Sequence, residues 1–247
     1  MKRLVLYIYI FVLLVNIASF ASAKVLKVAT GTGIVPYCYR DDKDVITGFD
    51  VEVIREVGKR LGYELKIDDM EFAAVIPAIM SGKYDVLASA MSITKARGEK
   101  VDFSIPYHSG ATTSIGVKAD NKSIKNINDL KGKTVSTITG SIQSDLLSDI
   151  GGVNVVEYAT ITDALIALYT GKSEASLTPT ASLLTFIKDR GQGKIKAVEG
   201  EISTKGVGLA VKKGNKKLLA EINKALESMK GDGTLDKITN KFFPPKK

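Results

Sequence analysis

Short apolar runs along the chain alternate with segments in which apolar residues recur every three or four positions. The run at residues 25–30 predicts a buried strand, and residues 48–50 predict the start of a helix. We expect Asp50 to cap that helix and Gly62 to end it. Its apolar stripe consists of Val53, Ile54, Val57 and Leu61. Strands and helices that alternate in this way favour a mostly parallel sheet covered by helices, and therefore an α/β fold.

A short internal repeat indicates two parts of similar plan. Residues 79–89 and residues 168–178 each read as a helix end, a Gly-Lys turn, an acidic residue and a strand. Two α/β lobes built alike explain this repeat.

Two apolar, glycine-containing stretches, residues 111–117 and 206–211, are interpreted as paired strands that cross between the lobes. This predicts lobe 1 from residues 24–111 and 205–247, with lobe 2, residues 112–204, inserted into it. A C-terminal helix is expected to pack back on lobe 1 through an apolar stripe. That stripe consists of Leu218, Ile222, Leu226 and Met229.

The first 23 residues have the pattern of a secretory signal peptide. Lys2 and Arg3 precede an apolar run at residues 4–14, and small residues end the segment at Ala23. The run is shorter than the ~20 residues that span a bilayer. We therefore expect export to the periplasm with cleavage after Ala23.

The formal net charge of +8 comes from dispersed lysines, in a chain that has no Trp and no nucleic-acid-binding motif. No nucleic-acid partner is therefore expected. Cys38 is the single cysteine, which excludes an internal disulfide and favours a small buried side chain. His108 is the single histidine, so no zinc site is expected, and the sequence indicates no cofactor.

Small and hydroxyl-bearing residues follow four of the predicted strands. In open α/β sheets, ligands bind beyond the carboxyl ends of the strands. A cleft between the lobes would then be lined by backbone amides and hydroxyls. The four segments are Thr30-Gly-Thr-Gly33, Ala90-Met-Ser92, Thr139-Gly-Ser141 and Thr178-Pro179.

Arg97 follows Ser92 by a single turn, which is close enough for its side chain to fold back over such a cleft. A guanidinium there would match a carboxylate with two parallel hydrogen bonds. An exposed surface position is the ordinary alternative for an arginine, and a core position is the ordinary alternative for Tyr37 and Phe72.

Two segments make the chain resemble the amino-acid-type solute-binding proteins of ABC importers. Gly48-Phe-Asp-Val-Glu-Val-Ile-Arg-Glu-Val57 is similar to that family's signature, and residues 85–107 follow its order of strand, Ser/Thr-Ile-Thr, Arg, Asp-Phe-Ser and Pro-Tyr. The resemblance runs from about residue 24 to residue 243. It implies a bilobal, type II periplasmic-binding-protein fold with two hinge strands, which closes on one small ligand. It also implies a non-catalytic protein whose partner is an ABC permease, and we expect a monomer.

The resemblance also implies roles for particular residues. Arg97 would grip the ligand's α-carboxylate, with help from Ser92 and from backbone amides around Ser141 and Ile142. The Ala90 carbonyl and the Ser92 hydroxyl would meet the α-ammonium. The remaining predicted contacts are Tyr37, Phe72 and Thr178.

Two positions depart from the family's pattern. The acid that usually pairs with the ligand ammonium aligns with Pro179, and the acid that serves cationic side chains aligns with Gly31. Proline offers neither a charge nor an N–H group. We therefore expect a neutral or polar amino acid, or another small carboxylate, rather than lysine, arginine or histidine.

Two other functions stay open on the same fold. Periplasmic cyclohexadienyl dehydratases are similar in build, but the position of their catalytic acid is Ser182 here. A hydroxyl does not replace the proton donor that general acid catalysis needs. A role in sensing or adhesion, in which binding does not serve uptake, is the other alternative.

Overall fold

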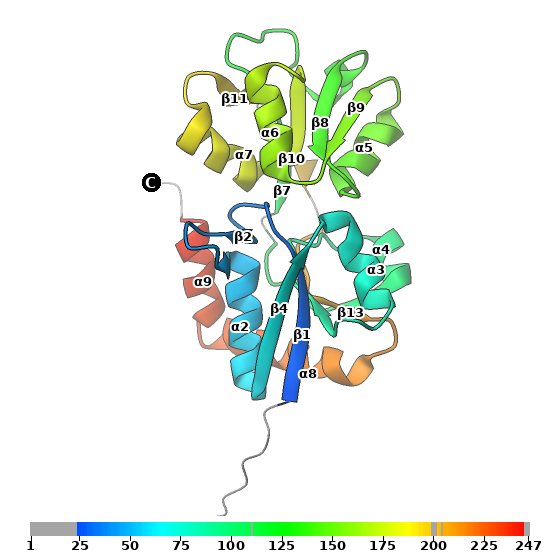
Figure 1. Cartoon of the computed structure of the whole chain (residues 1–247), viewed down its shortest axis with the longest axis vertical. Coiled ribbons are helices and arrows are strands. Elements are labelled where there is room, and N and C mark those ends of the chain that lie inside the picture. The colour runs from blue at the N-terminus through cyan, green and yellow to red at the C-terminus, as the bar shows by residue number, and fades with distance from the viewer. Residues whose placement is uncertain (1–23, 110, 199–201, 204, 245–247) are drawn as a thin grey trace, which may run out of the picture.

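The computed structural model describes residues 24–109, 111–198, 202–203 and 205–244. Two lobes are stacked along the long axis, each with a sheet and helices on its sides (Figure 1). The predicted signal peptide, residues 1–23, lies outside the described residues. Within the described ranges, no helix has the length and hydropathy that crossing a membrane requires.

Lobe 1 is built on a sheet with strand order β4-β1-β5-β13-β6. Strand β1 pairs in parallel with β4 and β5, whereas β13 runs antiparallel between β5 and β6. The predicted first strand is therefore confirmed. The bounds are β1 (Lys24–Gly31), β4 (Tyr63–Met70), β5 (Val86–Leu87), β6 (Val101–Phe103) and β13 (Ala210–Lys212).

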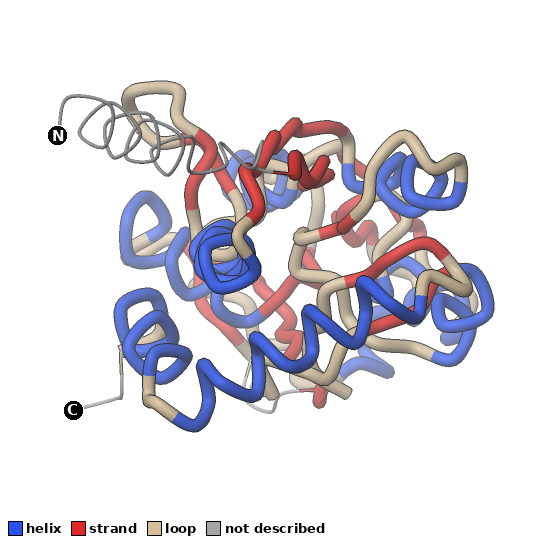
Figure 2. Tube along the Cα trace, turned by 90° about the horizontal axis from the view of Figure 1, so that it is seen from below, coloured by secondary structure: helices blue, strands red, loops and turns tan. Residues whose placement is uncertain are grey.

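Helices cover both faces of this sheet. Helices α2 and α9 lie on one side of β1 and β4 and helices α3 and α4 on the other (Figure 1), and the view from below shows strands surrounded by helices (Figure 2). The predicted C-terminal stripe of α8 is buried, which confirms that this helix packs on lobe 1. The bounds are α2 (Phe49–Leu61), η1 (Phe72–Ala74), α3 (Val75–Met80), α4 (Lys95–Lys100), α8 (Lys216–Gly231) and α9 (Thr234–Phe242), with a small hairpin of β2 (Tyr39–Arg40) and β3 (Ile46–Thr47).

Lobe 2 contains a second sheet with strand order β11-β7-β10-β8-β9, and β12 pairs with β7 beside it. Its strands are β7 (Thr112–Lys118), β8 (Thr134–Ile138), β9 (Asn154–Tyr158), β10 (Ala175–Pro179), β11 (Ile195–Ala197) and β12 (Ile202–Ser203). Its helices are η2 (Ile127–Leu130), α5 (Ile142–Ile150), α6 (Ile161–Thr170), α7 (Thr180–Phe186) and the π-helix η3 (Ile187–Gly191). The mixed α/β, bilobal fold class is confirmed.

Helix α2 ends as expected and begins differently. Gly62 takes the left-handed conformation, with φ of 71°, and closes the helix through its backbone N–H. The expectation that Asp50 caps the helix is wrong, because Gly48 occupies the cap position and the Asp50 carboxylate accepts a hydrogen bond from the Ala90 N–H instead. This fully buried carboxylate therefore ties α2 to the end of β5.

The internal repeat corresponds to the same local structure in both lobes. Helix α3 and helix α6 each end at a glycine-containing turn that leads into the central strand of its sheet. The acid of each copy then accepts a hydrogen bond from the backbone of the adjacent parallel strand. Asp85 Oδ2 accepts from Lys27 N at 2.8 Å, and Glu174 Oε2 accepts from Thr134 N at 3.0 Å.

The two crossing segments run antiparallel, as predicted, but at shifted positions. The pairs are His108 with Val207, Thr112 with Ser203 and Thr113 with Ile202, which all keep one register. The predicted stretches 111–117 and 206–211 do not pair with each other. Instead β7 lies in the lobe 2 sheet and β13 in the lobe 1 sheet, because each strand completes the sheet of its own lobe.

Candidate functional site

A small cavity of about 30 Å³ lies between the lobes, at the ends of the strands. We call it the Arg97 cavity. Elements of lobe 1 provide Ile34, Phe72, Ala90, Ser92 and Arg97, and elements of lobe 2 provide Ile138, Ser141, Ile142, Gln143, Ile161 and Pro179. Six of the eight predicted ligand contacts are thus brought together, and the predicted convergence of strand ends agrees with this arrangement.

Arg97 lies on the short helix α4, whose N-terminus is capped by Thr94. The Thr94 Oγ1 accepts a hydrogen bond from Arg97 N at 3.2 Å, which fixes the first turn. From there the side chain turns inward, so that Arg97 is only 8% exposed. Its guanidinium donates to the Ser92 carbonyl at 3.1 Å within lobe 1 and to the Gly140 carbonyl at 3.2 Å in lobe 2. The side chain therefore joins the lobes.

The Arg97 guanidinium is a buried cation, and no acid in the part of the chain that the structure describes forms an ion pair with it. None of the ion pairs among the described residues includes it. Burial lowers its pKa to about 10, an effect that the charge of Asp145 opposes. The Phe72 ring lies 5.7 Å from the guanidinium carbon and provides a weak cation–π contact. A buried charge in this state is costly unless an anion binds to it.

The end of β5 presents backbone and hydroxyl groups beside Arg97. Ala90 has a positive φ of 48°, a conformation that non-glycine residues rarely adopt. The hydrogen bond from its N–H to Asp50 holds this turn. Burial raises the pKa of the Asp50 carboxyl to about 7, and the hydrogen bond from Ala90 N–H opposes that rise.

The N-terminus of α5 faces Arg97 from lobe 2. Gly140, with φ of 71°, makes the turn out of β8, and the Ser141 Oγ then accepts a hydrogen bond from Ser144 N at 3.1 Å. Because the first backbone N–H groups of a helix have no partner within it, this end attracts anions. The Ser141 N–H donates to the Ile138 carbonyl at 3.3 Å, so the donor at this helix end that faces the guanidinium is the N–H of Ile142.

The structure does not bring Tyr37 to the Arg97 cavity. Its side chain lies in the core of lobe 1, with its ring centroid 5.9 Å from that of His108 and 5.1 Å from that of Phe243. Ile34, three residues earlier in the same loop, lines the cavity in its place. Burial raises the pKa of the Tyr37 hydroxyl and lowers that of His108, as expected for core positions.

Thr178 also lies outside the cavity lining. It is buried in β10, and its Oγ1 has no hydrogen-bond partner among the described residues. The next residue, Pro179, for which the family resemblance implies an acid, lines the cavity. A side chain at Gly31 would place its Cβ 2.9 Å from Ser89 Oγ and 3.2 Å from Phe72 Cα, so this loop has no room for the other acid.

Four lining residues were not predicted from the sequence: Ile34, Ile138, Gln143 and Ile161. Gln143 carried a usable signal, because it lies in the first turn of the helix expected to bind an anion. Its Nε2 donates to Thr113 Oγ1 at 2.8 Å, which connects α5 to the crossing strand β7. The three isoleucines look like ordinary core residues in the sequence.

Comparisons with known proteins agree with this geometry. Residues 26–245 match the family described as bacterial extracellular solute-binding proteins, family 3. The L-cystine-binding protein TcyA of Bacillus subtilis is 33% identical over 92% of this chain and 84% of its own length.

Two solved structures of ancestral proteins are similar as well. One, an ancestral arginine-binding protein bound to arginine, is 39% identical with a TM-score of 0.85, over 89% of this chain and 98% of the other. The second is an ancestral amino-acid-binding protein described as a precursor of cyclohexadienyl dehydratase. It is 30% identical with a TM-score of 0.82, over 89% of this chain and 95% of the other.

Proposed function

The chain belongs to family 3 of the bacterial extracellular solute-binding proteins, and we propose that it captures a small carboxylate-bearing ligand, a neutral or polar amino acid, for an ABC importer. Its relatives bind amino acids and include proteins named for cystine and arginine. The observation that carries the proposal is the buried guanidinium of Arg97, which lies between the lobes and opposite the N-terminus of α5, and which has no acidic partner among the described residues.

The ligand carboxylate binds to Arg97 and to the backbone N–H of Ile142, beside the Ser141 side chain. The Ala90 carbonyl and the Ser92 hydroxyl accept from donors on the ligand, and Phe72 covers its apolar part. Neither Tyr37 nor Thr178 is assigned a ligand contact. Because the carboxylate touches both lobes, it stabilises the closed arrangement and shifts the population towards it.

The proposal includes a location and a partner. Residues 1–23 direct export and are removed after Ala23, and the mature protein works in the periplasm as a monomer that docks on an ABC permease. Lobe 1 comprises residues 24–111 and 205–247, and lobe 2 comprises residues 112–204. The strand membership of the two sheets supports these boundaries, because every strand from 112 to 203 belongs to the second sheet among the described residues.

We propose binding without catalysis. One similar structure is a binding protein described as a precursor of an enzyme, so the fold is compatible with both activities. Ser182 stands where the dehydratases have an acid, and a serine hydroxyl is not a general acid at neutral pH. Turnover of a prephenate-like acid by the purified protein would reverse this assignment.

A thermal-shift screen tests the proposal. Amino acids, including cystine and arginine, and small carboxylates are screened with the wild type, with Arg97→Ala and with Arg55→Ala, an exposed arginine outside the cavity. At a hundredfold excess over Kd, a ligand adds about 2.7 kcal/mol to the free energy of unfolding. We expect shifts with the wild type and with Arg55→Ala, and none with Arg97→Ala.

The unliganded variants provide the control for folding. Because Arg97→Ala removes a buried charge that has no acidic partner in the described part of the chain, we expect its melting temperature without ligand to stay level or rise. A ligand shift that survives in Arg97→Ala, or a wild type that responds to no carboxylate, would contradict the proposed function.

A further inference from the structure

A second cavity, of about 130 Å³, lies between the lobes beside the Arg97 cavity. We call it the lateral cavity. It is lined by Gly33 and Val35 from lobe 1 and by residues of α6, α7 and η3 from lobe 2. Ile161 lines both cavities, so the two spaces are adjacent.

The lateral cavity lies where a loop of lobe 1 meets the start of α6. Gly33 has a φ of 90°, and a Cβ at this position would lie 2.8 Å from the Thr160 Cβ. The loop therefore approaches lobe 2 too closely for a side chain at position 33. An occupant of the lateral cavity touches both lobes and favours the closed arrangement, as a carboxylate at Arg97 does.

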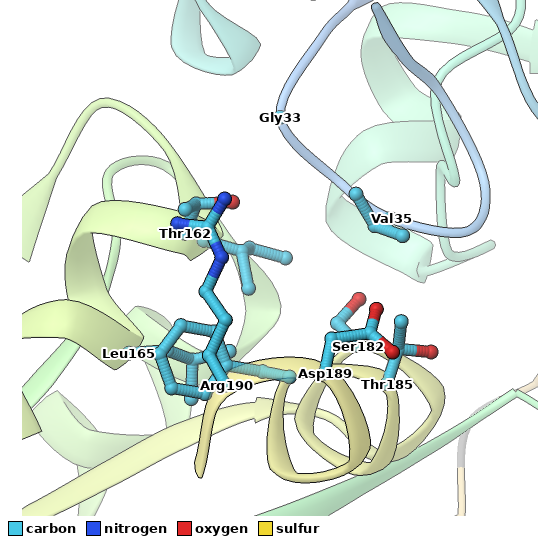
Figure 3. A pocket seen from close by; sticks show the side chains of 10 residues that line it. Gly33, Val35, Thr162, Leu165, Ser182, Thr185, Asp189 and Arg190 are labelled. Carbon is cyan, nitrogen blue, oxygen red and sulfur yellow. The ribbon is translucent and has the colours of Figure 1, made fainter. Parts of the chain in front are cut away.

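Ser182 is a buried polar residue of the lateral cavity with incomplete hydrogen bonding. It is 3% exposed, and its Oγ has no hydrogen-bond partner among the described residues. Thr185 lies three residues further along α7, on the same helical face. Figure 3 shows both side chains opposite Val35. Because an unsatisfied buried hydroxyl costs free energy, a ligand group that bonds with Ser182 is favoured.

The charges beside the lateral cavity are exposed to solvent. Asp189 and Arg190 line it, but water screens the charges of exposed side chains. A charged ligand group would lose its hydration here without gaining a buried counter-charge, and an apolar group would leave the Ser182 hydroxyl unsatisfied. The cavity therefore fits an uncharged polar group. Its buried lining residues are all uncharged: Ile161, Leu165, Ser182 and Phe186.

The two cavities match the two ends of an amino acid. The Arg97 cavity of about 30 Å³ has room for little more than a carboxylate, since a single water needs roughly 10–15 Å³ on this scale. Pro179 lines that cavity and Ser182 lines the lateral one. Three residues along a helix rise roughly 5 Å, which is the length of a side chain with four or so bonds.

We propose that the lateral cavity receives the side chain of the amino acid whose α-carboxylate is held by Arg97, and that Ser182 selects an uncharged polar group at its end. A serine hydroxyl both donates and accepts hydrogen bonds, and so does an amide. The ligand class is therefore a neutral amino acid with an amide-bearing side chain of about the length of glutamine. This inference rests on the proposed function, because it requires Arg97 to hold the carboxylate.

Calorimetric titration with amino acids of matched size tests the inference. The probes are L-glutamine, the shorter L-asparagine, the apolar L-norleucine and the charged L-glutamate, whose shape is nearly that of L-glutamine. We expect L-glutamine to bind at least about tenfold more tightly than each of the other three, because only its side chain reaches Ser182 with an uncharged polar group.

Substitution of Ser182 then assigns the contact. Ser182→Ala is expected to weaken binding of L-glutamine about fivefold and to leave that of L-norleucine unchanged. Ser176→Ala is the matched control, because this buried serine of β10 lines neither cavity and its Oγ donates to the Ser136 carbonyl. It is expected to leave the ratio of the two affinities as in the wild type. Melting temperatures of the unliganded variants show that each one folds.

The outcomes separate this inference from the proposed function. If amino acids bind in an Arg97-dependent way, but L-glutamine has no advantage over L-norleucine or Ser182→Ala weakens both alike, the side-chain site is wrong and the proposed function stands. If no amino acid or small carboxylate binds the wild type, or if binding survives Arg97→Ala, the proposed function fails and the side-chain site fails with it.

Discussion

Arg97 concentrates the charge of the cleft in a single side chain. A guanidinium has five N–H groups, and within the described ranges Arg97 donates two hydrogen bonds from its guanidinium, to the carbonyls of Ser92 and Gly140. The remaining donors are available to a carboxylate in the Arg97 cavity. Lysine has no planar fork of this kind, so the geometry accounts for an arginine at this position.

The sequence predicted the residues whose role follows from their distance to a strand end. Arg97, Ser92 and Ser141 belong to this group, because a strand end and a short turn determine where they lie. Tyr37 does not belong to it, because the backbone of its loop turns between Ile34 and Cys38. As a result the Ile34 side chain lines the Arg97 cavity and the Tyr37 side chain lies in the core of lobe 1. The spacing of apolar residues in the sequence does not indicate a turn of this kind.

Replacing Pro179 by aspartate is expected to create the missing partner for an α-ammonium. Position 179 caps α7 and lines the Arg97 cavity, and aspartate is a favoured residue at a helix N-terminus. We expect the affinity for L-alanine to rise about tenfold, while that for propionate does not rise. Calorimetric titration measures both, and Pro179→Asn is the uncharged control. Equal changes for the two ligands would show that the ammonium does not lie near residue 179.

The buried Asp50 predicts an unusual dependence of stability on pH. Its ordinary pKa is 3.8, and burial raises the pKa to about 7 in the folded protein. The folded state therefore holds a proton that the unfolded state has already released. Below pH 4 this group therefore contributes about 4 kcal/mol to the free energy of unfolding. The contribution is lost as the pH rises towards 7.

Urea unfolding at several pH values tests this expectation with Asp50→Asn, in which the amide oxygen still accepts from the Ala90 N–H. The free energy of unfolding of Asp50→Asn is not expected to fall between pH 4 and pH 7. That of Asp149→Asn, which replaces an exposed acid on α5, is expected to fall as in the wild type. A wild type and an Asp50→Asn variant with parallel profiles would show that Asp50 ionises normally in the folded protein.

At the scale of elements, the sequence was most informative where local chemistry decides the structure. The turn at Gly62, the stripe of α8 and the repeated helix-turn-strand unit follow from glycine, apolar spacing and an acid, and each is found in the structure. The crossing strands were predicted about four residues C-terminal to the segments that pair in the structure. In an apolar, glycine-containing stretch, the partner strands determine the register. The sequence of either segment alone contains no signal for its pairing with a distant segment.

Gly140 provides a test of the element that connects β8 to α5. A Cβ at this position would lie 3.3 Å from the Cβ of Ala73 in lobe 1, so alanine crowds only the closed arrangement. Gly132 has a similar φ, 73° against 71°, but no atom lies within 4 Å of the corresponding Cβ. Each substitution is expected to lower the free energy of unfolding by about 1 kcal/mol, because alanine disfavours positive φ.

Only Gly140→Ala is expected to weaken ligand binding, by roughly fivefold, because only it opposes closure. Calorimetric titration of the ligand found in the screen compares the two variants with the wild type. Equal affinities for Gly140→Ala and Gly132→Ala would mean that the approach of Gly140 to Ala73 plays no part in closure.

At the scale of the whole molecule, two sheets of similar plan bring their strand ends to one cleft. The contacts that cross it include the hydrogen bond from Arg97 to Gly140 and apolar side chains from both lobes, and the crossing strands provide the covalent connection. A ligand that touches both lobes can therefore change the balance between open and closed arrangements with a modest difference in binding energy. The specificity of such a protein depends on what the closed cavity accepts.

A crystal structure of the protein with the tightest ligand from the thermal-shift screen tests the central claim most directly. We predict closed lobes, with a ligand carboxylate within hydrogen-bond distance of the Arg97 guanidinium and of the backbone N–H of Ile142. A ligand bound elsewhere, with Arg97 still bonded only to the carbonyls of Ser92 and Gly140, would contradict the account.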